Sequence, residues 1–231
     1  MWQKFYQQHR GENFEILSIA VDVQGPAVVR PFTEKFGVTF PVTVDSADVL
    51  GQAFGLTIIP ETFLVDEVGI IRLHGNGPEA ALLRQIESVL KETPAAVRAE
   101  MPQLPAARSL AELEHAVRKS PTDWPLRLAQ ARLYDSGQRY AEAAAQLEAA
   151  SQLQPHEWSI PFLWGLVLLH QNHKDAALSR LKHARDLAPD NWRIRKQIWA
   201  LEHPDKFYSG DSPDYGWQKE ELAREKDAAG K

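Results

Sequence analysis

The sequence predicts a small α/β region in the first 92 residues and an all-helical repeat region after residue 108. Two observations support this division. In the first part, short apolar runs alternate with stretches of helical periodicity, as in α/β folds. From residue 109 onward, the same columns of residues recur every 34 positions, which is typical of stacked helix pairs. A third observation bears on chemistry. The 231 residues contain no cysteine, which excludes disulfides, thiolate nucleophiles and cysteine-ligated metals.

The composition of the chain argues against several further classes of function. Hydrophobic residues make up 44% of the chain, as in ordinary globular proteins, and no apolar run is long enough to span a membrane. The net charge of −5, with well-mixed signs, argues against nucleic acid as a partner. His170 and His173 fall at a predicted helix turn, where a solvated surface is a better interpretation than a metal site. We expect no bound cofactor and no metal.

The first elements of the α/β region follow from local patterns. An amphipathic helix is predicted over residues 2–10 and ends at Gly11. The apolar run at residues 14–21 has the composition of a strand that is covered on both faces. A second helix begins at Gly25-Pro26 and ends near Phe36, with Pro31 inside it as a kink.

The remaining elements of this region are short. Residues 40–44 are predicted to be extended, and residues 48–54 to form a helix. Two apolar runs at 62–65 and 70–73 flank a turn ending in Gly69, which is the spacing of a β-hairpin. A helix over residues 79–91 completes the region.

Residues 93–108 are rich in proline and alanine and are interpreted as a linker. The helix at 109–120 begins with Ser109 and Glu112 in a capping box. Two full repeats follow, at 124–155 and 158–189, and a capping helix extends from 192 to 202. The polar residues of this last helix, which are expected to face solvent, are Arg193, Lys196 and Gln197. The helical domain therefore spans 109–203, and residues 204–231 are predicted to be a polar, mobile tail apart from Tyr215 and Trp217.

Four columns define the repeat. They hold leucine, alanine, proline and tryptophan and occur at Leu113, Leu147 and Leu181; Ala116, Ala150 and Ala184; Pro121, Pro155 and Pro189; and Trp124, Trp158 and Trp192. This pattern resembles the tetratricopeptide repeat (TPR), which implies a docking surface for a protein partner. In that family the first helix of each repeat lines a concave groove. Carried over by position, the groove residues are Leu128, Arg132, Asp135, Ser136, Phe162, Leu166, Leu169 and His170.

The first region carries two further motifs, Phe-Pro-Val-Thr-Val-Asp at 40–45 and Pro-Glu-Thr-Phe-Leu-Val-Asp at 60–66, followed by Gly69-Ile70-Ile71-Arg72. With this spacing the region resembles thioredoxin-fold redoxins of the TlpA/ResA/DsbE type, within the AhpC/TSA-like proteins. The resemblance implies a cis peptide bond before Pro60. It also implies a loop formed by Ile59, Pro60 and Glu61 that borders the redox-active pair and contacts partner proteins.

The chain departs from that family where its chemistry resides. A redoxin of this type begins with a strand and a Cys-x-x-Cys motif, and both would precede Met1. The strand would lie between those matching residues 14–21 and 61–65. We therefore interpret the α/β region as incomplete, through a truncated or misplaced start, or through a start placed after a selenocysteine codon in a Cys-x-x-selenocysteine motif. No catalytic residue is assigned, and we expect the chain as given to be redox-inactive.

Two functions remain open. In one, the complete protein is a thiol–disulfide oxidoreductase with a helical docking module. In the other, it is a redox-inactive adaptor that binds partners through the groove. Relatives of the TlpA type are usually exported or membrane-tethered. No export signal is recognised in this chain, so the sequence leaves the compartment open.

Overall fold

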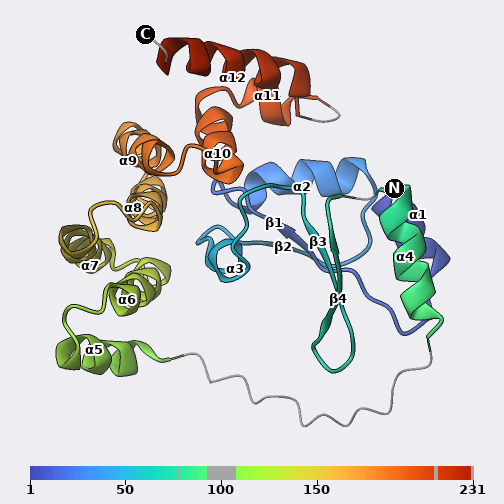
Figure 1. Cartoon of the computed structure of the whole chain (residues 1–231), viewed down its shortest axis with the longest axis horizontal. Coiled ribbons are helices and arrows are strands. Elements are labelled where there is room, and N and C mark those ends of the chain that lie inside the picture. The colour runs from blue at the N-terminus through green and yellow to red at the C-terminus, as the bar shows by residue number, and fades with distance from the viewer. Residues whose placement is uncertain (78, 93–107, 211–212, 230–231) are drawn as a thin grey trace.

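A computed structural model describes residues 1–77, 79–92, 108–210 and 213–229. An α/β region lies beside an arc of helices that continues over its upper side, as viewed in Figure 1. The segment predicted as a linker, apart from Arg108, lies outside the described residues.

The α/β region contains two separate ladders. The first strand, β1, pairs in parallel with β2, and β3 pairs in antiparallel fashion with β4. Within the described residues these ladders do not hydrogen-bond to each other. The elements in chain order are α1 (Trp2–Gln8), β1 (Ser18–Ala20), α2 (Pro26–Lys35), β2 (Val42–Val44), α3 (Val49–Ala53), β3 (Thr62–Val65), β4 (Ile71–Gly75) and α4 (Ala80–Leu90).

The first strand is shorter than the run at 14–21 predicts. Its pairing begins where the Ser18 N–H donates to the Pro41 carbonyl, and it ends where the Asp45 N–H donates to the Ala20 carbonyl. Residues 14–17 pair with no strand among the residues that the structure describes. Phe14 instead packs edge-on against Phe5 of α1. Partner length, rather than apolar composition, therefore sets the bounds of β1.

The apolar core of the α/β region is small. Phe5, Leu82 and Ile86 are its buried members, and they join α1 and α4 to the β3–β4 hairpin through Leu64 and Leu73. Val23, which follows β1, packs instead into the core of the helical region. The β1 side of the α/β region thus depends on contact with the helices.

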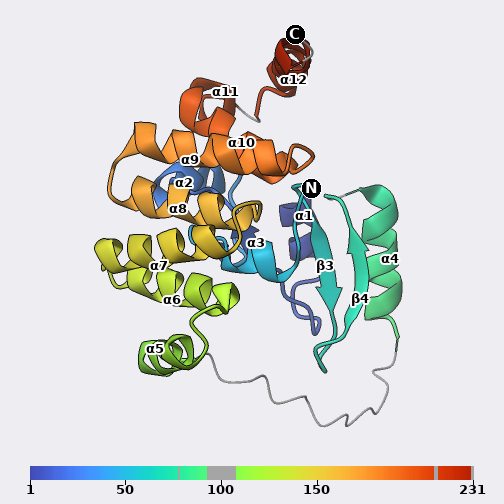
Figure 2. The same ribbon diagram turned by 60° about the vertical axis from the view of Figure 1, so that its left-hand side comes forward.

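The helical region is a series of antiparallel helices, seen from a second side in Figure 2. Neighbouring helices pack in sequence order from α5 to α10. Their bounds are α5 (Leu110–Lys119), α6 (Trp124–Ser136), α7 (Tyr140–Leu153), α8 (Ser159–His170), α9 (Lys174–Leu187), α10 (Trp192–Glu202), α11 (Asp205–Tyr208) and α12 (Tyr215–Ala229).

Members of the leucine and alanine columns lie at the centre of this region. Leu147, Ala150, Leu181 and Ala184 are all fully buried. Gly165 of α8 lies against Leu181 of α9 so closely that a Cβ atom would be 2.8 Å from the Leu181 Cγ. Small residues therefore occupy the positions where paired helices approach most closely.

The predicted capping box is present at the start of α5. Ser109 accepts a hydrogen bond from the Glu112 N–H, and the Glu112 side chain accepts one from the Ser109 N–H. These two bonds satisfy N–H groups that a helix terminus leaves unpaired.

The segment predicted as a polar tail contains two helices, α11 and α12. Trp217 of α12 packs edge-on against Trp199 of α10. The Trp199 indole N–H donates to Glu225 at 2.8 Å, and Arg195 donates to the same carboxylate. Long-range aromatic and charged contacts hold this segment, and Trp217 was its one residue in these contacts that the sequence set apart from the mobile tail.

Candidate functional site

The two regions meet at the concave side of the helical arc, where α3 faces α6, α8 and α10 (Figure 1). Helix α10 makes most of the polar contacts. The prediction that its polar side chains face solvent is wrong, because Arg193 is 1% exposed and Gln197 is 5% exposed. Both side chains are turned toward the α/β region.

Helix α10 binds main-chain groups on both sides of the α/β region. The Gln197 amide donates to the Val21 carbonyl at 2.7 Å, just after β1. The Arg193 N–H donates to the Thr57 carbonyl at 3.1 Å. The Lys196 ammonium donates to the Ile59 carbonyl at 3.1 Å, and burial lowers the pKa of Lys196. Helix α10 therefore holds the segment that leads into β3.

Buried charges form the centre of this contact. The Arg193 guanidinium donates to Asp48, and both side chains are almost completely buried. Arg132 of α6 is close enough to Asp48 to influence its charge. Asp45, which precedes α3, accepts hydrogen bonds from the N–H groups of Val49, Leu50 and Gly51. Two arginines from separate helices thus converge on the N-terminal end of α3.

Burial and the charge of Arg193 shift the pKa of Asp48 in opposite directions. Burial raises the pKa of this carboxyl to about 6, and the Arg193 charge opposes the increase. Burial also lowers the pKa of Arg132 and of Arg193. Asp48 Oδ2, Arg193 Nε and two Arg132 nitrogens have no hydrogen-bond partner among the described residues. The charges of the contact are therefore complementary, but several of its buried polar atoms lack a hydrogen-bond partner among the described residues.

This pKa predicts a pH dependence. A carboxyl whose folded pKa is raised stabilises the fold at a pH below its unfolded value of 3.8, and this contribution is lost as pH rises through about 6. We expect the free energy of unfolding of the parent chain, relative to Asp48→Asn, to decrease between about pH 4 and pH 6. The groups facing Asp48 are Asp45, Arg132 and Arg193, and they are unchanged in the variant. Urea unfolding at several pH values measures the difference. A constant difference would contradict the assignment.

The loop expected to border a redox-active pair lies beside this contact. The Ile59–Pro60 peptide bond is cis. Glu61 pairs with His74 across the hairpin at 3.0 Å. In both ribbon views, the N-terminus of α1 and the start of β3, just after this loop, lie at the same end of the α/β region (Figures 1 and 2). The loop therefore lies at the same end of the α/β region as the beginning of the chain.

The predicted groove residues do not line an empty channel. Leu128, Phe162 and Leu166 are at most 4% exposed and belong to the helical core. The side chains of Asp135 and His170 come together at 2.8 Å and link α6 to α8. Ser136 is exposed and donates to a carbonyl of its own helix. Leu169 is half-buried against the core. Of the predicted set, Arg132 is the residue that meets the charges of α3.

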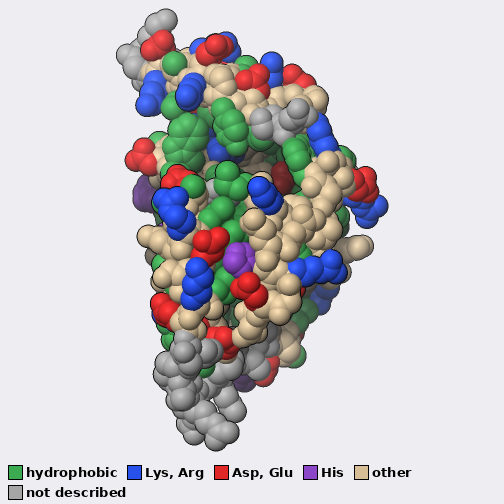
Figure 3. Space-filling model, turned by 90° about the vertical axis from the view of Figure 1, so that its right-hand side faces the viewer, with side chains coloured by type: hydrophobic (Ala, Val, Ile, Leu, Met, Phe, Trp, Pro, Cys, Tyr) green, Lys and Arg blue, Asp and Glu red, His purple; other side chains and the backbone are tan. Residues whose placement is uncertain are grey.

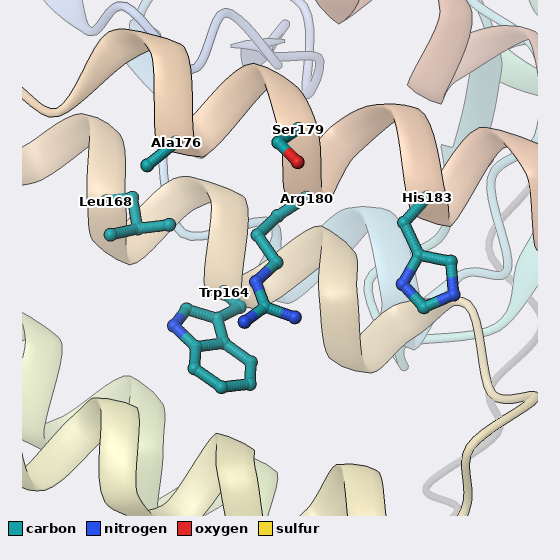
Figure 4. A pocket seen from close by; sticks show the side chains of 6 residues that line it. All are labelled: Trp164, Leu168, Ala176, Ser179, Arg180 and His183. Atoms are coloured by element: carbon teal, nitrogen blue, oxygen red, sulfur yellow. The ribbon is translucent and has the colours of Figure 1, made fainter.

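A hollow lies between α8 and α9, and its lining residues come from these two helices. The Arg180 guanidinium stacks on the Trp164 ring at 3.7 Å from its centroid, as Figure 4 shows. The other lining residues are Leu168, Ala176, Ser179 and His183. Among the described residues, its lining contains the titratable side chains Arg180 and His183 and no carboxylate.

The surface adds little to the choice of site. On the face shown in Figure 3, acidic and basic side chains are interspersed among hydrophobic ones, without a large area of one sign. Among the helices that the structure describes, none combines the length and apolar character needed to cross a membrane.

Comparison with known proteins shows which proteins the first region is similar to. The AhpC/TSA family matches residues 1–74. Thiol-disulfide oxidoreductase ResA of Geobacillus thermodenitrificans is 33% identical over 89 residues, which cover 37% of this chain and 50% of ResA. ResA of Halalkalibacterium halodurans is 28% identical over 91 residues, covering 38% of this chain and 51% of that protein. Sporulation thiol-disulfide oxidoreductase A of Bacillus subtilis is 29% identical over 82 residues, covering 35% and 50%.

The chain spans about half the length of these curated relatives. Its N-terminal region is an AhpC/TSA thioredoxin-like domain that resembles ResA, and its C-terminal region is helical. The chain itself contains no cysteine.

Proposed function

We propose that this chain is the scaffold and docking part of a thioredoxin-like thiol–disulfide oxidoreductase, with a TPR-like helical region that receives a protein partner. The observation that carries the proposal is the match of residues 1–74 to the AhpC/TSA family, together with relatives that are thiol-disulfide oxidoreductases. The burial of the leucine column, and of Ala150 and Ala184 in the alanine column, supports the TPR-like assignment.

Disulfide exchange needs a thiolate that attacks a disulfide sulfur and a second thiol that resolves the mixed disulfide. Because the chain contains no cysteine, it supplies neither group. Under the proposal, the sulfur or selenium atoms of the reaction are supplied by residues that are not in this sequence. Under the proposal, the role of these residues is to hold the loop around Pro60 in place and to dock the partner.

One alternative is a redox-inactive adaptor in which the α/β region only binds. The absence of cysteine favours it directly. The extensive contacts of α10 with the α/β region favour it too, because they make the first region part of a single binding body.

The two functions predict different results for an extended protein. We expect this chain alone to show no insulin reduction at any pH. We expect activity when the in-frame sequence encoded upstream of Met1 is added, if it supplies a strand and a Cys-x-x-Cys or Cys-x-x-selenocysteine motif. The matched control is the same extension with both redox residues replaced by serine.

The measurement combines dithiol-exchange rates with the thermal stability of the extended protein. A single added segment should both stabilise the α/β region and create activity. An extended protein that gains stability but remains inert with reduced, accessible thiols would exclude the oxidoreductase and leave the adaptor. Unrelated upstream sequence would do the same.

A further inference from the structure

We propose that the concave face of the helical region is a releasable binding site whose ligand is the chain's own helix α3, so that an external protein segment binds there only by displacing α3. This inference rests on the docking role given to the helical region above. It adds which segment occupies the site, which charges recognise it, and what kind of partner can replace it.

Charged side chains make the contact between α3 and the helical region specific. Asp48 lies at the N-terminal end of α3 and meets Arg193, with Arg132 close by. Gly51, three residues later, lies so close to the Arg193 guanidinium that a Cβ atom would clash with it. In the arrangement seen here, the site therefore accommodates an acidic residue followed after three positions by glycine. A competing partner needs the acidic residue, and a small residue three positions later leaves the Arg193 guanidinium in place.

The contact of α3 adds little net stability, although its charged side chains are buried. Helix α3 has only five residues, too few to be stable by itself. Asp48 adopts the left-handed region at φ 55°, which aspartate tolerates better than most residues other than glycine, so the backbone there adds little to the stability of the contact. Removing a buried ion pair from water offsets most of its Coulomb attraction, so the net contribution to stability is small. Specific recognition at low net stability is what a displaceable ligand requires.

The release of α3 affects a second segment of the α/β region, because both segments are bound by α10. The Thr57 and Ile59 carbonyls accept hydrogen bonds from Arg193 and Lys196, on the same helix that binds Asp48. Displacement of α3 would loosen the segment that leads to Pro60. A partner bound at the helical groove is thereby coupled to the loop of the thioredoxin-like domain.

The test uses the full chain with two substitutions that expel α3 by different means. Asp48→Arg replaces attraction with repulsion, and Gly51→Leu places a side chain where Arg193 lies. The matched control is Glu34→Arg, the same type of charge change on an exposed face of α2. The probe is a labelled synthetic peptide with residues 44–57 of this sequence.

We expect hydrogen exchange of the α3 amides to accelerate about tenfold or more in both variants, while the helical melting transition is retained. We expect the peptide to bind both variants about tenfold more tightly than the parent or Glu34→Arg. The same peptide with Asp48→Arg should not bind.

Three results would overturn the proposal. Unchanged α3 protection in both variants would mean that the ion pair does not hold α3. Loss of the helical melting transition would make α3 a permanent part of the core. Failure of the peptide to bind the opened variants would mean that the face is not a ligand site. None of these assays involves thiol chemistry, so their outcome is independent of whether the complete protein exchanges disulfides.

Discussion

Residues 109–231 expressed alone should unfold in one cooperative helical transition, whereas residues 1–92 alone should show none. The core of the helical region is built from its own helices, with Val23 as the one buried contribution from the α/β region among the described residues. Its contacts are between neighbouring helices, and this local arrangement favours independent folding. The polar residues Arg193 and Gln197 would regain water once the α/β region is removed.

The α/β region has no comparable support. Its main core cluster contains three buried residues, Phe5, Leu82 and Ile86. Its strands form two separate two-stranded ladders, and such ladders are marginally stable by themselves in water. Separation also removes the bonds from Gln197 to Val21 and from Tyr208 to Asp22. We expect the isolated fragment to lose its ordered structure entirely.

Circular dichroism and urea unfolding of the two fragments, beside the full chain, measure this difference. A helical fragment with weak, non-cooperative unfolding would mean that the repeats depend on the α/β region. A cooperative transition in residues 1–92 would mean that its small core is sufficient.

The sequence predicted those parts of the fold that depend on local patterns. The helices of the repeat region follow from periodicity, and Leu147, Ala150, Leu181 and Ala184 are buried as their columns require. The hairpin at β3 and β4 follows from two apolar runs around a turn that ends in Gly69. In each case, residues near each other in sequence decide which face is covered.

The contact between the two regions could not be predicted in this way. Asp48 and Arg193 are separated by 145 positions, and neither has a local pattern that indicates burial. The polar residues of α10 were interpreted as a solvating cap because a terminal repeat usually has one. Helix α12 was missed for a similar reason, since its charged sequence is held by Trp199 and Arg195 of another helix. A polar residue is expected to face solvent when only its own sequence neighbourhood is known, and a partner from a distant segment can reverse that expectation.

The last prediction tests the repeat register through size changes in opposite directions. Leu181 is fully buried and lies against Gly165, so Leu181→Ala leaves a cavity and should lower the free energy of unfolding by about 2–5 kcal/mol. Ala184, one turn later on α9, is fully buried where helices approach closely. Ala184→Leu should therefore overpack the core and cost about 1–3 kcal/mol.

Ala145→Leu is the matched control, because Ala145 lies on the exposed side of α7, which holds the same place in the preceding repeat. Exposed substitutions away from special features usually change stability by less than about 0.5 kcal/mol. Urea unfolding monitored by helical circular dichroism compares the three variants with the parent. If Ala184→Leu and Ala145→Leu had equal effects, the small-residue column would not mark the close approach of helices. The 34-residue register would then be wrong. A large loss in both core variants beside an unchanged control requires that the columns, and not overall hydrophobicity, hold the helices together.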